Sequence, residues 1–227
     1  MGLTSVLKLN CISCNRDVQE ALYNTVFLPK LFTMILGFII LAFIVIILAL
    51  FSFKKYKSHS AFVPDKDLLN PVPLSITAII LGIGIGGFID GILFHQILQW
   101  HGMFTNQLPA DTIVGKSVNM FWDGIFHSLT LIAVIIGIIS LTRLLKKKNI
   151  NPSPKLVLGG FFAGWGHFNF VEGIIHHHIL NFHNIKEFSN NPNLWNYGFL
   201  IIGVIFMIIG FTIIYNREHY PARLDEE

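Results

Sequence analysis

The chain has 227 residues, of which 53% are hydrophobic and only 13% are charged, and its mean hydropathy is +0.62. A soluble domain usually carries about 25% charged residues, so this composition argues against a soluble protein and indicates an integral membrane protein. The formal charge of +3 comes from basic residues gathered in a few loops. The sequence therefore gives no reason to expect nucleic-acid binding.

The N-terminal segment, residues 1–30, contains the only two cysteines of the chain, Cys11 and Cys14. It lacks the apolar stretch of a secretory signal peptide. A single Cys-x-x-Cys pair is a weak signal, and two interpretations stay open if this tail faces outward. The pair either forms a disulfide or is a thiolate site that takes up a soft ion such as Cu(I).

Five apolar runs follow, each close to the ~20 residues that a membrane-spanning helix needs. They cover residues 31–53, 73–95, 118–142, 156–178 and 195–215. We therefore predict an all-α membrane protein of about five transmembrane helices. Lys and Arg are most frequent after the first run, between the third and fourth, and after the fifth. Because cytoplasmic loops are enriched in these residues, we expect a multi-pass protein of the bacterial cytoplasmic membrane, with its N-terminus outside and a cytoplasmic tail at 217–227.

The sequence repeats itself within the last four runs. GIGIGGFIDGILFHQILQWH at 82–101 and GWGHFNFVEGIIHHHILNFH at 164–183 share glycines and histidines at matching positions, and Asp90 becomes Glu172. Further matches pair Trp122 with Trp195 and Gly137 with Gly210. Fixed-period similarity indicates a duplicated unit, here a parallel repeat of a two-helix hairpin. We expect repeat one at 71–148, repeat two at 152–216 and an additional first helix at 31–55.

Histidines and carboxylates gather toward the outward ends of these helices. Ionisable residues at membrane depth are costly and usually functional, which makes the following residues candidates for one site: Asp90, His95, His101, Asp123, His127, His167, Glu172, His176, His177 and His183. Imidazole with carboxylate is a ligand mixture that suits zinc, iron, copper or manganese. We therefore predict a transition-metal site near the outer membrane face, with copper, iron or zinc as the ion and copper as the first choice.

The spacing of the candidates gives a mixed picture of which side chains share a helix face. Glu172 and His176 are four apart and share a face, and His183 returns to it if the helix continues. Asp90 and His95 are five apart, so either they have different partners or the helix is wound differently there. The run of histidines at 176–178 cannot point all three rings one way, so at least one of them has a structural role.

Other functions remain open at this stage. The same residues suit a proton or ion pathway without metal, or structural polar packing, and His127 with His167 suits bis-histidine haem, although the nearby carboxylates argue against haem. A metal site would serve metal handling, a membrane metalloenzyme with di-metal oxidation chemistry, or a small subunit of a respiratory or oxygenase complex. No residue is predicted to be catalytic.

The phrases GFIDGILFHQILQWH, WDGIFH and VEGIIHHHILNFH, in this order, resemble a family of predicted bacterial membrane proteins classed as a domain of unknown function. The resemblance covers roughly residues 70–215. Members of that family are sometimes fused to CtaG-type copper-assembly factors of cytochrome oxidase, so the resemblance implies an association with copper and oxidase assembly. The expected partners are the lipid bilayer and, by this association, other membrane subunits or a copper-assembly factor.

Overall fold

The computed structural model describes residues 68–147 and 150–219, together with single positions between 16 and 43. Within these residues the regular elements are helices, and one isolated bridge joins Asn70 to Ile150. The predicted first helix at 31–53 lies outside the described residues except for single helical positions such as Phe32 and Phe43. Cys11 and Cys14 lie outside them as well.

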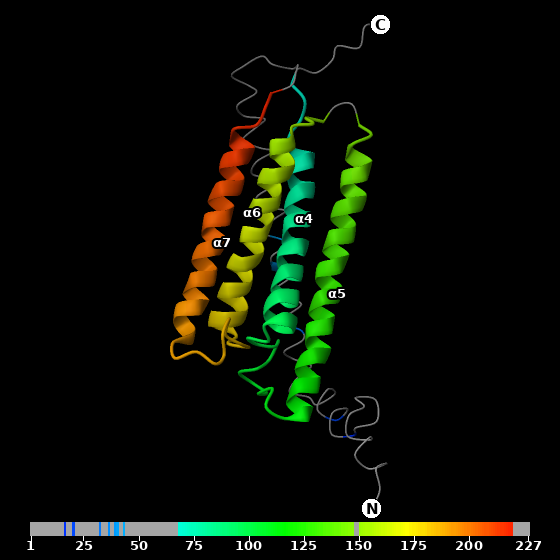
Figure 1. Ribbon diagram of the computed structural model, residues 1–227. Coiled ribbons are helices and arrows are strands. Elements are labelled where there is room, and N and C mark those ends of the chain that lie inside the picture. Colours follow the sequence, from blue (N-terminus) through cyan, green and yellow to red (C-terminus); the bar gives the residue numbers. More distant parts are fainter. Residues whose placement is uncertain are drawn as a thin grey trace, which may run out of the picture.

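Four long helices form the described part of the chain. They are α4 (Val72–Asp90) continued by the π-helical η3 (Gly91–Ile97), α5 (Ile113–Leu144), α6 (Pro154–Glu172) continued by η4 (Gly173–Ile179), and α7 (Pro192–Tyr215). Figure 1 shows them side by side in the order α5, α4, α6, α7, with α4 in contact with α6 and each flanked by one further helix. The loops that follow η3 and η4 therefore lie at the same end of the bundle, the lower end in Figure 1.

The helix starts are marked by residues that suit helix N-termini. Thr112 accepts a hydrogen bond from the backbone N–H of Gly115 at 3.0 Å, and Asn191 accepts one from Leu194 at 3.3 Å. Both are side-chain caps that satisfy an N–H group which has no partner within the helix. Prolines occupy the first turns of α4, α6 and α7, where the missing N–H costs nothing. The sequence thus determines locally where each helix begins.

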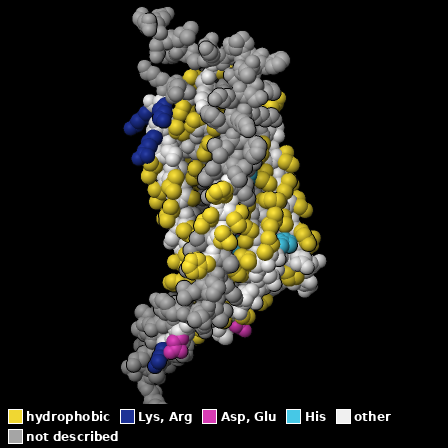
Figure 2. Space-filling view, turned by 180° about the vertical axis from the view of Figure 1, so that it is seen from behind, with side chains coloured by type: hydrophobic (Ala, Val, Ile, Leu, Met, Phe, Trp, Pro, Cys, Tyr) yellow, Lys and Arg dark blue, Asp and Glu magenta, His cyan; other side chains and the backbone are white. Residues whose placement is uncertain are grey.

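Three of the described helices are long and apolar enough to cross a membrane: Val72–Ile97, Ile113–Leu144 and Pro192–Tyr215. In Figure 2 hydrophobic side chains cover much of the lateral surface, and Lys and Arg gather at the end where α5 terminates. The predicted span at 156–178 does form a helix of similar length, α6 with η4. It is not among these three because Asn169, Glu172 and several histidines interrupt its apolar run.

Glycines allow α4 and α6 to approach closely. A Cβ atom added at Gly82 would overlap the backbone carbonyl oxygen of Phe161, and one added at Gly164 would overlap that of Ile79. The two contacts are equivalent with the helices exchanged, since 79 and 161, like 82 and 164, are 82 positions apart. Small residues at such crossings are what lets membrane helices pack without a gap.

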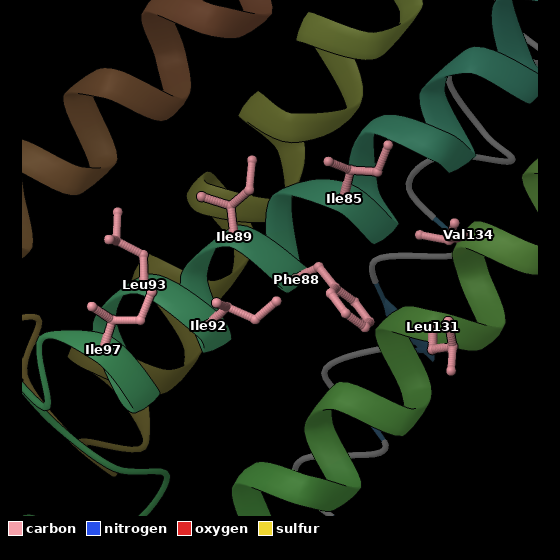
Figure 3. Close-up of a pocket in the computed structure, with 8 residues that line it drawn as sticks. All are labelled: Ile85, Phe88, Ile89, Ile92, Leu93, Ile97, Leu131 and Val134. Carbon is pink, nitrogen blue, oxygen red and sulfur yellow. The ribbon is translucent and has the colours of Figure 1, made fainter.

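An apolar groove of about 500 Å³ runs along α4, η3 and α5 (Figure 3). Its lining consists of Ile85, Phe88, Ile89, Ile92, Leu93, Ile97, Leu131 and Val134. Several of these side chains, Ile92, Leu93 and Leu131 among them, are exposed on the side of the bundle. An exposed apolar surface of this kind fits a helix pair surrounded by lipid.

Candidate metal centre

The π-helical turns η3 and η4 bring carboxylates and histidines five residues apart onto one face. In each turn the backbone hydrogen bonds join residue i to residue i+5, so one turn contains more residues than a turn of α-helix and residues five apart come to lie on one face. As a result His95 Nε2 lies 3.3 Å from Asp90 Oδ2, and His177 Nε2 lies 3.3 Å from Glu172 Oε1. Of the two readings that the spacing of five left open, local rewinding of the helix is the one observed.

A second histidine reaches each carboxylate region from the loop that follows. The chain turns at Gln99 and Asn181, which have positive φ angles of 50° and 48°, and returns His101 and His183 to the bundle, where both are buried. His183 Nε2 lies 3.2 Å from Glu172 Oε1. The expectation that His183 shares a face with Glu172 on a continuing helix is wrong in its cause, because η4 ends at Ile179 and the loop makes the contact.

Backbone carbonyls fix the tautomers of these two loop histidines. His101 Nδ1 is 2.8 Å from the carbonyl oxygen of Ile185, and His183 Nδ1 is 3.0 Å from that of Met103. A carbonyl oxygen can only accept, so each Nδ1 carries the proton and each Nε2 presents a lone pair. Burial lowers the pKa of His183 to about 4 and that of His101 well below its usual range, so both imidazoles are neutral at pH 7.

The two helix histidines are fixed in the same way by side chains of α5 and α7. His95 Nδ1 lies 2.8 Å from Asp123 Oδ1, which also accepts the backbone N–H of Met103 at 2.9 Å. His177 Nδ1 lies 3.3 Å from Asn196 Oδ1, which also accepts the backbone N–H of Ile185 at 2.9 Å. Both oxygens act as acceptors, so the Nδ1 atoms are protonated, and in the neutral form of each imidazole the lone pair is then on Nε2.

Aromatic side chains surround the two helix histidines. The His95 ring stacks on Phe126 with centroids 5.8 Å apart, and the His177 ring stacks on Phe199 at 5.6 Å. Phe126 and Phe199 belong to the main apolar core, which lies at this end of the bundle. The core therefore holds both rings in place and excludes water from their inner edges.

We call six buried residues the imidazole–carboxylate cluster: Asp90, His95, His101, Glu172, His177 and His183. Within it, Nε2 lone pairs face carboxylate oxygens, so acceptors are directed at acceptors. Among the described residues no group hydrogen-bonds to either carboxylate oxygen of Asp90 or to Glu172 Oε2. Burying an uncompensated carboxylate costs several kcal/mol, so the arrangement requires a cation or additional protons between these atoms.

Two overlapping sets of ligand atoms in the cluster are close enough to share an ion. His95, His101 and His183 form one set, and Glu172, His177 and His183 form the other, with the ligand atoms of each set within 4.8 Å of one another. The rings of His101 and His183 are parallel to within 4°, with centroids 4.6 Å apart. Imidazole nitrogens and a carboxylate at these separations are suited to divalent transition metals.

Two of the predicted candidates, His127 and His167, are not brought into the cluster. Each directs Nδ1 at a backbone carbonyl one turn earlier in its own helix, at 2.6 Å. The ring of His127 packs against Phe88, and that of His167 packs against Phe211. Neither residue belongs to the two sets of ligand atoms described above.

The three consecutive histidines divide as the sequence predicts, with one ring directed elsewhere. His177 belongs to the cluster, whereas His178 is exposed and packs against Tyr197 with ring centroids 5.0 Å apart. His176 is buried beside the cluster, where its Nδ1 lies 3.8 Å from Glu172 Oε1 and its ring stacks on Phe182. His178 is therefore the member of the run that points away from Glu172.

A cavity of about 550 Å³ at the loop end of the bundle reaches part of the cluster. Its lining includes His95, His101 and Asp123, together with the charged side chains of Asp111, Lys116 and Glu187. The apolar groove of Figure 3 has none of the six cluster residues in its lining. Among the described residues, this cavity exposes His95 and His101 to the polar loop end of the bundle.

Asn196 is the functional residue that sequence reasoning missed. It holds His177 as Asp123 holds His95, but an amide in a membrane helix attracts less notice than a carboxylate. The sequence did contain a signal, because aligning Trp122 with Trp195 in the repeat makes Asn196 the position equivalent to Asp123. The contacts of His183 and His101 with the backbone carbonyls of Met103 and Ile185 could not be predicted from the sequence, because every residue type has a backbone carbonyl.

The chain belongs to the family described as predicted membrane protein DUF2243, whose sequence profile matches residues 77–217. This range includes all six residues of the imidazole–carboxylate cluster, as well as Asp123 and Asn196. No curated protein matches the chain, and no solved structure matches it either.

Proposed function

We propose that this member of the DUF2243 family binds a transition metal through the imidazole–carboxylate cluster. The observation that carries the proposal is the set of Nε2 lone pairs facing carboxylate oxygens, with separations of 3.2 and 3.3 Å around Glu172 Oε1. Ligands of a tetrahedral ion with bond lengths of ~2.0–2.1 Å stand about 3.3 Å from one another. The donors are therefore spaced as they would be around an ion such as zinc, copper or iron.

Charge distribution supports a site near the outer face of the membrane. Arg143, Lys146 and Lys147 lie at the opposite end of the bundle from the cluster, and such residues favour the cytoplasmic side. In this orientation the protein holds or hands over its ion outside the cytoplasmic membrane, with copper for oxidase assembly as the first candidate. Cys11 and Cys14 would take up the ion, and residues 31–53 would supply a fifth spanning helix.

We also propose that the four helices are two copies of one hairpin. The support is that equivalent contacts recur 82 positions apart in α4 and α6 and 73 positions apart in α5 and α7. Asp90 pairs with His95 as Glu172 does with His177, and the holder of the helix histidine, Asp123, becomes Asn196. A parallel repeat of this kind places its shared site on the axis between the copies.

Elemental analysis tests the metal proposal. The protein is purified in mild detergent without chelator or affinity metal, and inductively coupled plasma mass spectrometry is applied to the wild type, His177→Gln and His178→Gln. We expect at least one equivalent of copper, iron or zinc in the wild type and in His178→Gln, because the His178 ring points away from Glu172. In His177→Gln the metal content should fall clearly, since the substitution removes one Nε2 donor.

His127→Gln is a second control, because the structure places this ring against Phe88. Circular dichroism should show the same helix content in all variants. A wild type that takes up no metal even on reconstitution, or a His177→Gln variant that retains full metal content, would overturn the proposed function in favour of protons at the same groups.

A further inference from the structure

We infer that the cluster holds two metal ions in unequal positions, one bound by Asp90, His95 and His101 (the first triad) and one by Glu172, His177 and His183 (the second triad). This inference rests on the proposed function. It adds the number of ions, the division of the ligands and the cause of the difference between the two positions.

The division follows from what each donor can do. One Nε2 atom has one lone pair and serves one ion, although His183 belongs to both sets of ligand atoms. Its Nε2 lies 3.2 Å from Glu172 Oε1, which assigns it to the second triad. His95 and His101 are then left for the first ion. Asp90 belongs to neither set of ligand atoms, and we assign it to this ion because its Oδ2 lies 3.3 Å from His95 Nε2.

His95, His101 and His183 form a set that spans the two halves, but each carboxylate has its short separation to an imidazole of its own half, which favours two ion positions. An ion on the axis between α4 and α6 would draw its nearest ligands equally from the two helices. Instead Asp90 is paired with His95, five residues later on its own helix, and Glu172 with His177. Two imidazoles and one carboxylate per ion leave an open coordination position, as in metal sites that exchange a ligand.

The groups that accept hydrogen bonds from the Nδ1 atoms also correspond between the two triads, but with one difference. The loop histidines are held by carbonyls of the opposite half, His101 by Ile185 and His183 by Met103. The helix histidines are held unequally, because Asp123 is a carboxylate at 2.8 Å from His95 Nδ1 and Asn196 is a neutral amide at 3.3 Å from His177 Nδ1. A carboxylate behind an imidazole raises the basicity of the ligating nitrogen, so the first triad binds its ion more tightly.

Asp123→Asn is the substitution that isolates this difference. Asparagine keeps an oxygen for the N–H groups of His95 and Met103, so it reproduces in the first half the arrangement that Asn196 provides in the second. Asp123 is thus a positioning residue, and its replacement changes the tighter affinity without removing a ligand. Glu218→Gln is the control for the loss of one negative charge, since Glu218 lies at the opposite end of the bundle and outside the cavity that reaches the cluster.

The test titrates metal-depleted protein with Zn²⁺ in competition with a chromophoric chelator. For the wild type we expect two equivalents with two distinct affinities. Asp123→Asn should still bind two equivalents, with the tighter affinity weakened by about 10–100-fold, the usual effect of such a partner, and the weaker one little changed. Glu218→Gln should match the wild type. His101→Gln should retain one equivalent, which gives a second measure of stoichiometry if Asp123→Asn folds poorly.

The outcomes separate this inference from the proposed function. Binding of a single equivalent by the wild type, abolished by His101→Gln and by His177→Gln alike, would overturn the two-ion centre and leave metal binding intact. Equal weakening of both ions in Asp123→Asn would overturn the assignment of that residue to the first triad. Absence of any Zn²⁺ binding by the wild type would overturn both proposals.

Discussion

Gly164→Ala tests whether the contact of α4 with α6 determines both stability and the site. The added Cβ would overlap the carbonyl oxygen of Ile79 and lie 2.9 Å from its carbonyl carbon and from the backbone nitrogen of Ile83. Ordinary van der Waals contact begins near 3.4 Å. Because these are backbone atoms that cannot rotate away, and the carbonyl oxygen of Ile79 lies closest of all to the added Cβ, the two helices must move apart locally by about 1 Å.

The expected cost follows from two opposing effects. Overpacking in a tight interface costs about 1–3 kcal/mol, and alanine gains roughly 0.8–1 kcal/mol over glycine in helix propensity. We therefore expect Gly164→Ala to lower the free energy of unfolding by roughly 0.5–2 kcal/mol. Gly82→Ala should behave alike, and the double variant should cost less than the sum, because one separation of the helices relieves both overlaps.

Denaturant unfolding in mild detergent, followed by tryptophan fluorescence, measures these differences. Gly198→Ala on α7 is the control, since an added Cβ there meets nothing within 4 Å, and it should be neutral or stabilising. Zn²⁺ affinity should fall in Gly164→Ala, because α4 and α6 position the two halves of the imidazole–carboxylate cluster relative to each other. Equal stability of Gly164→Ala and Gly198→Ala, or strict additivity of the two α4–α6 variants, would refute the reasoning.

Two further predictions concern the π-helical turn and the other end of the bundle. Deleting Leu93 shifts His95 by one helix position, about 100°, so metal content should fall while circular dichroism shows unchanged helix content; retained metal would contradict the role of η3. At the opposite end, hydrogen bonds from Lys155 and then Ser153 lower the pKa of Glu218 from 4.5 to about 2, so the stability that they give is present above about pH 4.5 and is lost as the pH falls toward 2. Glu218→Gln should therefore reduce the fall in melting temperature between these pH values, and an unchanged pH profile would argue against this contact.

The membrane class and the helices at 73–95, 118–142 and 195–215 could be predicted from composition and apolar runs, because burial in lipid imposes a strong pattern on the residues. The local winding of η3 could not, since Asp90 and His95 at a spacing of five fit two geometries equally well. His127 was predicted to belong to the site because it is an ionisable residue at membrane depth among the other candidates. In the structure the His127 ring packs against Phe88. Its direction depends on the rotamer of the side chain, which the spacing of residues in the sequence does not determine.

The exchange of carbonyl partners between the two loops has a consequence for biosynthesis. His101 is synthesised well before Ile185, whose backbone carbonyl fixes the tautomer of His101. Likewise the backbone carbonyl of Met103 is synthesised well before His183, the histidine that it contacts. Until the second hairpin is made, Asp123 can already orient His95, but the carbonyl group that orients His101 is still absent. On the proposed function, a complete metal site would therefore form only after the second hairpin has been made and has packed against the first.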